Sequence, residues 1–182
     1  MESKEIKARL SEEGKDDEDE RGKENDSIRK TFLFGFSKGG VVLNQLLSEI
    51  AFFKEQNQII EQNTYGKLEC KTLFPISAPD LLKSIYEVHY IDVGLNCPGA
   101  YLTDKKLLEN VVKVMGCSSG SRIVFHGTPR QWKDKDRPWI AYEKDTCIAL
   151  LSSLAKSHND SVQISEKLYF ASERPSLQMH FK

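Results

Sequence analysis

The sequence predicts an α/β fold, with a parallel sheet of about four strands and flanking helices. Two observations lead to this fold class. Short apolar runs of strand length alternate four times with longer segments in which apolar residues recur at helical spacing. The first apolar run passes into a helical pattern at a glycine-rich turn with no linker between them. Such alternation is typical of parallel strands connected by helices that cross the faces of the sheet.

Charge divides the chain of 182 residues into two parts. Residues 1–30 hold eleven acidic and eight basic residues, a net charge of −3, whereas the whole chain carries −1. Their only sizeable apolar side chains are Ile6, Leu10 and Ile28. Such a segment buries too little apolar surface to offset the entropy of ordering it, so we expect a disordered charged tail over residues 1–30. Residues 31–182 are long enough for one folded domain.

The first half of this domain begins with a strand over residues 31–36. A helix follows to about Lys54, with its apolar side chains at helical spacing: Val42, Leu43, Leu46, Leu47, Ile50 and Phe53. Residues 55–71 are polar and are expected to form a surface excursion. A short helix should begin at Ser77-Ala-Pro-Asp80 and run through Ile85, because a capping-box-like pattern with an early proline starts helices.

The second half continues the alternation. We expect a strand over residues 88–94, a helix capped by Thr103 or Asp104 and ended by Gly116, and a third strand over residues 122–127. A polar loop over residues 128–138 comes next. A long helix over roughly residues 141–157 and a last strand near residues 167–170 complete the domain.

The glycine-rich turn has the pattern Gly35-x-Ser37-x-Gly39. This spacing is that of a nucleophile elbow, in which a serine sits on a tight strand-to-helix turn. Residues two before and two after the serine should lack bulk, so that strand and helix can approach each other. Ser37 Oγ would then project at a helix N-terminus, where partial positive charge favours an anionic intermediate. The alternative is a glycine-rich turn that binds a phosphate or nothing. A Walker phosphate loop is excluded, because no Gly-Lys-Ser/Thr follows at the required spacing.

Ser37, Asp134 and His180 form the candidate catalytic set. Sites in open α/β sheets lie beyond the carboxyl ends of the strands, and these residues follow predicted strands in the order serine, acid, histidine. His180 would accept the proton of Ser37 during attack, and the carboxylate would orient the imidazole and stabilise its cation. The backbone N–H of Lys38 would be one oxyanion donor.

Other acids and histidines compete for these roles. Asp136 lies two residues from Asp134, and Asp92 ends the second strand, so either could be the acid. His126 ends the third strand and is expected to be structural, with its nitrogens bonded to loop backbone. His89 and His158 suggest no role.

Four separated motifs resemble the chromosome 2 open reading frame 69 family, a eukaryotic family with an α/β-hydrolase fold of the serine lipase or esterase type. They lie in the expected order within residues 31–182: Gly35-Phe-Ser-Lys-Gly-Gly-Val-Val-Leu-Asn-Gln-Leu-Leu47, His126-Gly-Thr-Pro129, Arg137-Pro-Trp-Ile140, and Glu173-Arg-Pro-Ser-Leu with His180-Phe181. The resemblance implies that Ser37, Asp134 and His180 occupy the nucleophile, acid and base positions. It brings no substrate with it.

The resemblance also implies that residues 31–182 correspond to the C-terminal half of an α/β-hydrolase. Strands that precede the nucleophile strand in such folds, and the loop that gives the second oxyanion donor, have no counterpart here. We therefore expect a truncated serine hydrolase acting on a carboxylic ester or lipid, weak or inactive as this chain. The alternative is a non-catalytic interaction module that keeps the scaffold. Residues 31–36 should form an exposed apolar edge through which the chain self-associates.

Composition argues against several other classes. The four cysteines are scattered, with no C-x-x-C pair, which argues against a zinc site or a disulfide framework. We expect no metal and no cofactor. The near-neutral folded part has no basic stripe, so nucleic acid is not an expected partner. No apolar run is long enough to span a membrane, and no targeting signal is visible, so we expect a soluble intracellular protein of unspecified compartment.

Overall fold

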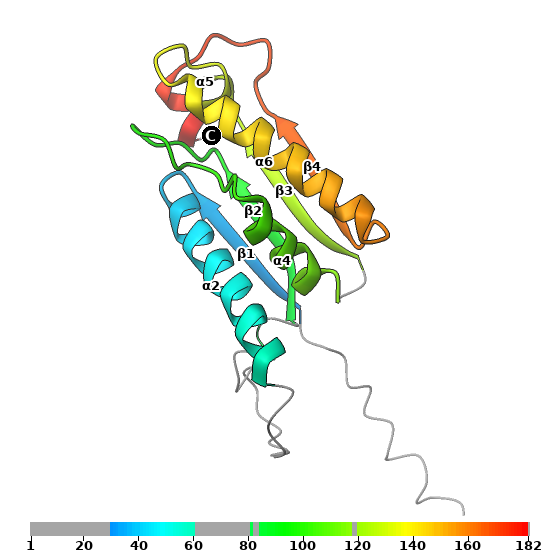
Figure 1. Cartoon of the computed structure of the whole chain (residues 1–182). Coiled ribbons are helices and arrows are strands. Elements are labelled where there is room, and N and C mark those ends of the chain that lie inside the picture. The colour runs from blue at the N-terminus through cyan, green and yellow to red at the C-terminus, as the bar shows by residue number, and fades with distance from the viewer. Residues whose placement is uncertain (1–29, 61–80, 82–83, 118–119, 182) are drawn as a thin grey trace, which may run out of the picture.

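The computed structural model describes residues 30–60, 81, 84–117 and 120–181 (Figure 1). Nearly all of the expected disordered tail, and most of the helix expected from Ser77, lie outside the described residues. The described elements are, in chain order, β1 (Thr31–Phe36), α2 (Gly39–Ile60), β2 (Ile85–Ile91), α4 (Lys105–Met115), β3 (Ser121–Gly127), α5 (Pro129–Trp132), α6 (Pro138–Ser157), β4 (Val162–Leu168) and the 3₁₀ helix η1 (Leu177–Phe181).

The strands form one sheet in the order β1-β2-β3-β4, and all three pairings are parallel. The predicted α/β class, with four parallel strands and flanking helices, is therefore confirmed. All strands run in the same direction, so their carboxyl ends meet at one edge of the sheet, as the arrowheads in Figure 1 show. β1 and β4 are the outer strands of this sheet.

Two strands lie earlier in the sequence than predicted. β2 begins at Ile85, which was predicted to end a helix, and it ends at Ile91. Ile85 and Val88 are buried, with Tyr86 between them absorbing an irregularity in the β1–β2 register. β4 spans Val162–Leu168 rather than residues near 167–170. The strand was not recognised at this position because its composition is polar. An outer strand with exposed positions does not need an apolar run.

The helices match the predicted periodicity more closely. Asp104 is the N-cap of α4, where its side chain accepts a hydrogen bond from the backbone N–H of Leu107 at 2.8 Å. This confirms one of the two predicted caps, and Gly116 ends the helix as expected. α2 continues to Ile60, beyond the predicted end near Lys54. α6 begins at Pro138, and the loop predicted before it contains the short helix α5.

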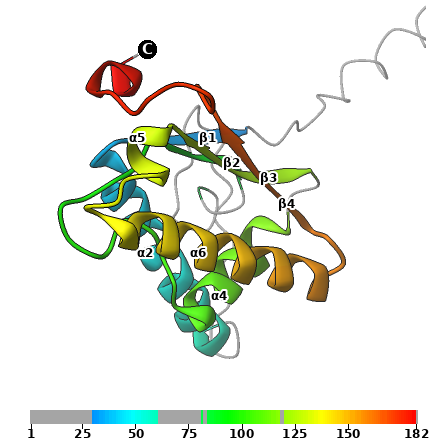
Figure 2. The same cartoon turned by 90° about the horizontal axis from the view of Figure 1, so that it is seen from above.

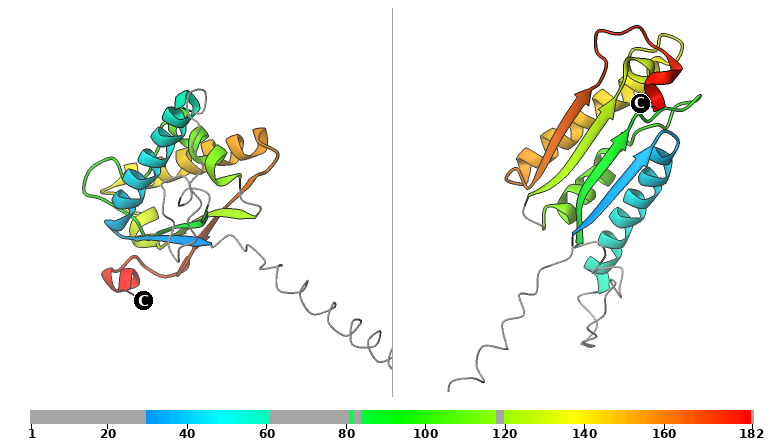
Figure 3. Two further views of the ribbon diagram at one scale, coloured as in Figure 1. Left: turned by 90° about the horizontal axis from the view of Figure 1, so that it is seen from below. Right: turned by 180° about the vertical axis from the view of Figure 1, so that it is seen from behind.

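Helices α2, α4 and α6 all cover the same face of the sheet (Figures 2 and 3). The hydrophobic core lies between these helices and the strands. Its largest fully buried side chains include Tyr90, Phe125, Leu47, Leu108, Ile140 and Leu151. The rings of Tyr90 and Phe125 stack with their centroids 5.1 Å apart, which joins the two central strands beneath the helices.

The opposite face of the sheet carries η1 at the carboxyl ends of the strands, as Figure 2 shows. The pairing register places Phe34 beside His89, and Ile91 beside His126, on adjacent strands. Phe34 is 61% exposed, whereas a partner helix would bury such a residue. We call this surface the open face, defined by the outward residues of β1 to β3: Phe32, Phe34, Phe36, Glu87, His89, Ile91, Arg122, Val124 and His126.

Buried polar side chains fix the loop that follows β2. Glu143 of α6 accepts backbone hydrogen bonds from Gly99 and Ala100 at 2.7 and 2.8 Å. Asn44 of α2 donates to the carbonyl of Ala100 at 3.1 Å and accepts from the hydroxyl of Tyr90 at 2.9 Å. Buried polar groups with satisfied hydrogen bonds hold a loop in one conformation. This loop begins at Asp92, so the bonds also anchor the end of β2.

Candidate functional site

Ser37 has the backbone geometry expected of a nucleophile elbow. It directly follows β1, and α2 begins two residues later at Gly39. Its φ angle is 54°, in the left-handed region that non-glycine residues seldom occupy. Its N–H donates to the carbonyl of Ile91 at 2.9 Å, which fixes the turn against the end of β2. Strain of this kind, on the order of 1 kcal/mol or more, persists where surrounding structure holds it, and it is concentrated at functional sites.

One of the two glycines of the predicted elbow pattern has the expected steric role, and the other does not. A Cβ atom at Gly35 would lie 2.5 Å from Leu43 Cδ1, so the strand approaches the helix closely there, as expected. A Cβ atom at Gly39 would meet nothing within 4 Å, so the expected need for small size at this position is wrong. Gly40 is the crowded position, because its Cβ would lie 2.4 Å from Val93 Cγ1.

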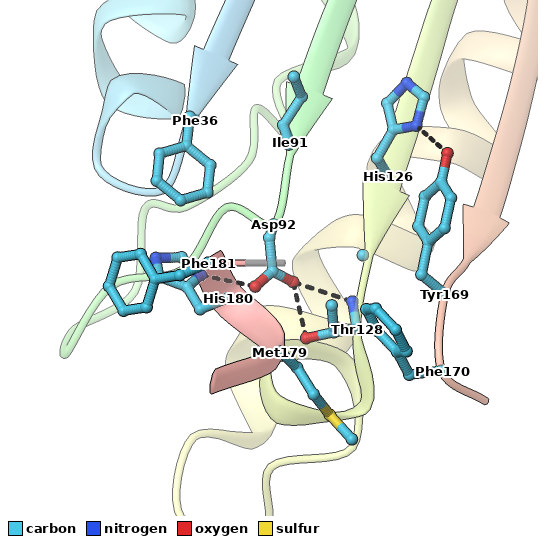
Figure 4. Close-up of a pocket in the computed structure, with 11 residues that line it drawn as sticks. Phe36, Ile91, Asp92, His126, Thr128, Tyr169, Phe170, Met179, His180 and Phe181 are labelled. Atoms are coloured by element: carbon cyan, nitrogen blue, oxygen red, sulfur yellow. Dashed lines mark hydrogen bonds and ion pairs between the residues drawn. The ribbon is translucent and has the colours of Figure 1, made fainter. Parts of the chain in front are cut away.

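Asp92 holds the imidazole of the site. It follows β2 and has a φ angle of 45°, so two left-handed polar residues end adjacent strands. Its Oδ2 lies 2.6 Å from His180 Nδ1. Its Oδ1 accepts hydrogen bonds from the backbone N–H and the hydroxyl of Thr128, at 2.8 and 3.0 Å. Both carboxylate oxygens are therefore occupied, and Figure 4 shows Asp92 between the two partners.

His180 reaches Asp92 from η1. The buried side chain of Met179 anchors this short helix, and the ring of Phe36 stacks on the imidazole with centroids 4.6 Å apart. The His180 side chain is only 9% exposed. Because a carboxylate only accepts hydrogen bonds, Nδ1 must carry the proton in this contact, which leaves Nε2 as an acceptor when the ring is neutral. That tautomer is the one a general base needs.

Asp134 does not contact His180, and the expectation that it would do so is wrong. Its carboxylate pairs with Arg137 at 2.8 Å and accepts the backbone N–H of Asp136 at 2.9 Å. Although partial burial acts to raise it, the pKa of Asp134 is lowered overall by the Asp136 amide and the Arg137 guanidinium. Asp136 is exposed in the same loop. The loop acids therefore organise their own turn, while Asp92 occupies the position beside the imidazole.

A pocket of about 570 Å³ opens at the carboxyl ends of the strands (Figure 4). Its lining is mainly aromatic and aliphatic, with two imidazoles and one carboxylate: Phe36, Ile91, Asp92, His126, Gly127, Thr128, Tyr169, Phe170, Met179, His180 and Phe181. Ser37 is adjacent in sequence to the lining residue Phe36. Within the described residues, no hydrogen bond joins Ser37 Oγ to His180. No described group accepts a hydrogen bond from Lys38 N–H, so this amide is available to a ligand.

His126 belongs to a second polar chain, formed by Glu87, His89, His126 and Tyr169, that was not predicted from the sequence. Its Nδ1 lies 3.0 Å from the hydroxyl of Tyr169, and its Nε2 lies 3.0 Å from His89 Nδ1. The expectation that its nitrogens bond to loop backbone is therefore wrong. Nε2 of His89 in turn contacts Glu87 at 2.8 Å, and Glu87 also pairs with Arg122. The parallel register of β2 and β3 was the signal that could have revealed it. Glu87 pairs with Arg122, and His89 lies two residues before Ile91, the partner of His126, so it is on the same face of the sheet.

Several other functional groups are absent from the part of the chain that the structure describes. No cluster of three or more histidine, cysteine or acidic side chains there could hold a metal ion. Cys97, Cys117 and Cys147 are free, and burial raises the pKa of the Cys147 thiol to about 12. None of the described helices combines the length and apolar character needed to cross a bilayer.

Sequence comparisons identify relatives of this chain. It is 29% identical over 151 residues to the mouse "Mitochondrial protein C2orf69 homolog" and 28% identical over 151 residues to the human "Mitochondrial protein C2orf69". These matches cover 82% of this chain but only 33% and 31% of the relatives, so the chain spans about a third of their length. A zebrafish homologue is 29% identical over 153 residues, with 36% of its length covered. No solved structure matches significantly.

The family model named C2orf69 matches residues 1–156. This range includes Ser37 and Asp92 and ends before β4 and His180. It also includes the charged residues 1–30, which lie before the four motifs that resemble this family. The match extends over most of the sequence, and the chain belongs to the C2orf69 family.

Proposed function

We propose that the chain carries the catalytic centre of a serine hydrolase that acts on carboxylic esters, with Ser37 as nucleophile, His180 as base and Asp92 as acid. The observation that carries this proposal is the 2.6 Å contact between His180 Nδ1 and Asp92 Oδ2 beside the left-handed Ser37. The likeness to the C-terminal half of an α/β-hydrolase is part of the proposal. Asp92 replaces Asp134 as the acid because Asp134 is paired with Arg137.

The proposed reaction follows from the proton positions. Ser37 Oγ attacks the ester carbonyl and transfers its proton to His180 Nε2, while Asp92 stabilises the imidazolium through Nδ1–H. The N–H of Lys38 donates to the oxyanion. His180 then protonates the leaving alcohol as its C–O bond breaks. Water, deprotonated by the same imidazole, attacks the acyl carbonyl on Ser37, and His180 returns this proton to Ser37 Oγ as the acyl–Oγ bond breaks and the acid leaves. Ser37 Oγ must rotate or shift toward His180 for the first step, as catalytic contacts often tighten only when substrate binds.

The pocket lining favours binding of an ester whose acyl group or alcohol has a substantial apolar surface. Phe36, Ile91, Phe170 and Met179 surround the space beside His180. Burying apolar ligand surface there contributes roughly 25 cal/mol per Å². An ester or lipid therefore suits the pocket better than a highly charged substrate. The names of the relatives carry the word "mitochondrial", and a mitochondrial location for this chain is likewise a proposal.

Fluorophosphonate labelling tests the proposed nucleophile. The purified chain should label at Ser37, and Ser37→Ala should abolish labelling while far-UV circular dichroism stays unchanged. Ser153→Ala is the matched control, because Ser153 is exposed on α6 and plays no part in the proposed centre. Equal labelling of the Ser37→Ala variant, or labelling lost in Ser153→Ala, would reject Ser37 as the nucleophile.

A second candidate function is a non-catalytic interaction module. The observation that favours it is the exposed apolar side of β1, where Phe32, Phe34 and Phe36 are 46%, 61% and 45% exposed on an outer strand. Exposed aromatic residues beside unpaired strand edges bind partners or cause aggregation. Labelling separates the candidates, since an interaction module that only retains the elbow has no activated serine.

A further inference from the structure

The second polar chain runs across the open face and ends in the pocket. It links Glu87, His89, His126 and Tyr169 through contacts of 2.8, 3.0 and 3.0 Å. None of its members belongs to the proposed triad. Figure 4 shows His126 and Tyr169 on the β3–β4 side of the pocket, apart from Asp92 and His180. The second polar chain therefore adds a separate polar group to an otherwise mainly apolar part of the pocket wall.

When both imidazoles are neutral, the direction of every hydrogen bond in the second polar chain follows from its far end. Arg122 can only donate, and its guanidinium contacts Glu87 Oε1. The hydrogen bond from Arg122 is the main cause that lowers the pKa of Glu87, against the effect of burial, so Glu87 is ionised and only accepts. His89 Nε2 must then carry a proton and donate it to Glu87. In a neutral His89 ring, Nδ1 is therefore an acceptor.

The same reasoning carries through the second imidazole. Because His89 Nδ1 accepts, His126 Nε2 must carry the proton between the two rings. Burial is the largest of the effects that lower the pKa of His126, and it keeps this ring neutral near pH 7. Its Nδ1 is therefore an acceptor, and the hydroxyl of Tyr169 must donate to it. The Tyr169 proton then points at His126 rather than into the pocket, and only the oxygen lone pairs of the phenol remain for a ligand.

We propose that Tyr169 selects ligands as a hydrogen-bond acceptor, because the second polar chain that begins at Glu87 fixes the direction of its hydroxyl proton. The pocket then prefers an apolar or aromatic ligand that bears an O–H or N–H donor. A ligand that offers only an ether or carbonyl oxygen at this point faces lone pairs and gains no hydrogen bond. One net hydrogen bond corresponds to roughly a fivefold difference in affinity between two such ligands. The remaining contacts with the pocket wall are shared by both ligand types.

Histidine tautomers test the direction of the chain. Long-range ¹H–¹⁵N correlation spectra of the full chain at pH 7.5 should show both His89 and His126 protonated on Nε2. In Glu87→Gln, Arg122 holds the amide oxygen, so the amide NH₂ faces His89 and every bond reverses. Both rings should then be protonated on Nδ1. Glu166→Gln is the matched control, because Glu166 pairs with Lys144 of α6 and is not a member of the second polar chain. A wild-type spectrum with either ring protonated on Nδ1 would overturn the proposal.

Matched probes test the preference of the pocket. The wild-type chain should bind 2-naphthol about fivefold more tightly than 2-methoxynaphthalene, measured by chemical-shift titration. Tyr169→Phe should bring the two affinities together, and Glu87→Gln should also remove the preference. Equal affinities in the wild type, or an unchanged preference in Tyr169→Phe, would overturn the acceptor role. These outcomes do not depend on labelling of Ser37, so the pocket preference and the hydrolase centre can fail separately.

Discussion

His180 Nδ1 and Asp92 Oδ2 lie 2.6 Å apart, although 88 residues separate them in the chain. The contact joins η1 to the end of β2 across the pocket, and Thr128 of the third strand's loop binds the other oxygen of the same carboxylate. Asp92 therefore connects three segments. Its loss should affect both stability and any chemistry of the site.

Asp92→Ala should destabilise the chain by roughly 1–3 kcal/mol, because it leaves the buried N–H of Thr128 without an acceptor. Asp134→Ala removes a partly exposed ion pair with Arg137, which contributes about 0–1 kcal/mol. Urea unfolding monitored by circular dichroism compares the two variants. A larger loss of stability in Asp134→Ala than in Asp92→Ala would contradict this description of the site.

Gly40→Ala and Gly39→Ala form a matched pair within the elbow. The added methyl of Gly40→Ala would overlap Val93 and should cost about 1–3 kcal/mol, the usual range for overpacking. The methyl of Gly39→Ala meets nothing within 4 Å, so this variant should be neutral or more stable through better helix propensity. Thermal unfolding of both variants provides the measurement. Equal destabilisation would mean that α2 and the β2 loop do not approach each other as described.

Stability should fall as the pH is lowered through the range below 6.5. Burial, His89 and Lys167 lower the pKa of His126 from its usual value of 6.5 in the folded state. The unfolded chain then binds a proton more readily, so the free energy of unfolding decreases as the pH falls through this window. His126→Gln should show a flatter pH dependence of stability between pH 7.5 and 5.5 than the wild type. Parallel curves for wild type and His126→Gln would contradict the prediction.

We expect the isolated chain to self-associate through the exposed outer strand β1. Phe34 is 61% exposed on a strand with no described neighbour on its other side. Sedimentation velocity should show concentration-dependent dimers or larger species, and Phe34→Lys should shift the population toward monomer. Val42→Lys, at a 69% exposed position on α2, serves as the control for added charge. A monomeric wild-type chain at all concentrations would contradict this prediction.

Local patterns predicted most of the fold. The spacing of Leu43 and Leu47 identified α2, and the helical cap at Asp104 was readable because capping uses a local hydrogen bond. The expected elbow at Ser37 was likewise a local pattern, and its φ angle of 54° agrees with it. β4 was misplaced because an outer strand with polar, exposed positions lacks the apolar run that marks a buried strand.

The long-range contacts of the site could not be predicted in the same way. Asp92, Asp134 and Asp136 all follow predicted strands or lie in the next loop, and sequence order alone does not say which carboxylate meets His180. The choice depends on Arg137, which binds Asp134 within its own loop, and on Thr128, which orients Asp92. The first contact joins residues three apart in one loop and the second joins the ends of two strands, and sequence order specifies neither.

Comparing the labelling rates of Asp92→Asn and Asp134→Asn with a fluorophosphonate is the most direct test of the proposed centre. If Asp92 orients His180 as proposed, Asp92→Asn should slow labelling of Ser37 by at least about a hundredfold, because an amide no longer holds the imidazole in the required tautomer or stabilises its cation. Asp134→Asn should label within about twofold of wild type. Wild-type labelling in Asp92→Asn together with a large loss in Asp134→Asn would contradict the account and return the acid role to Asp134.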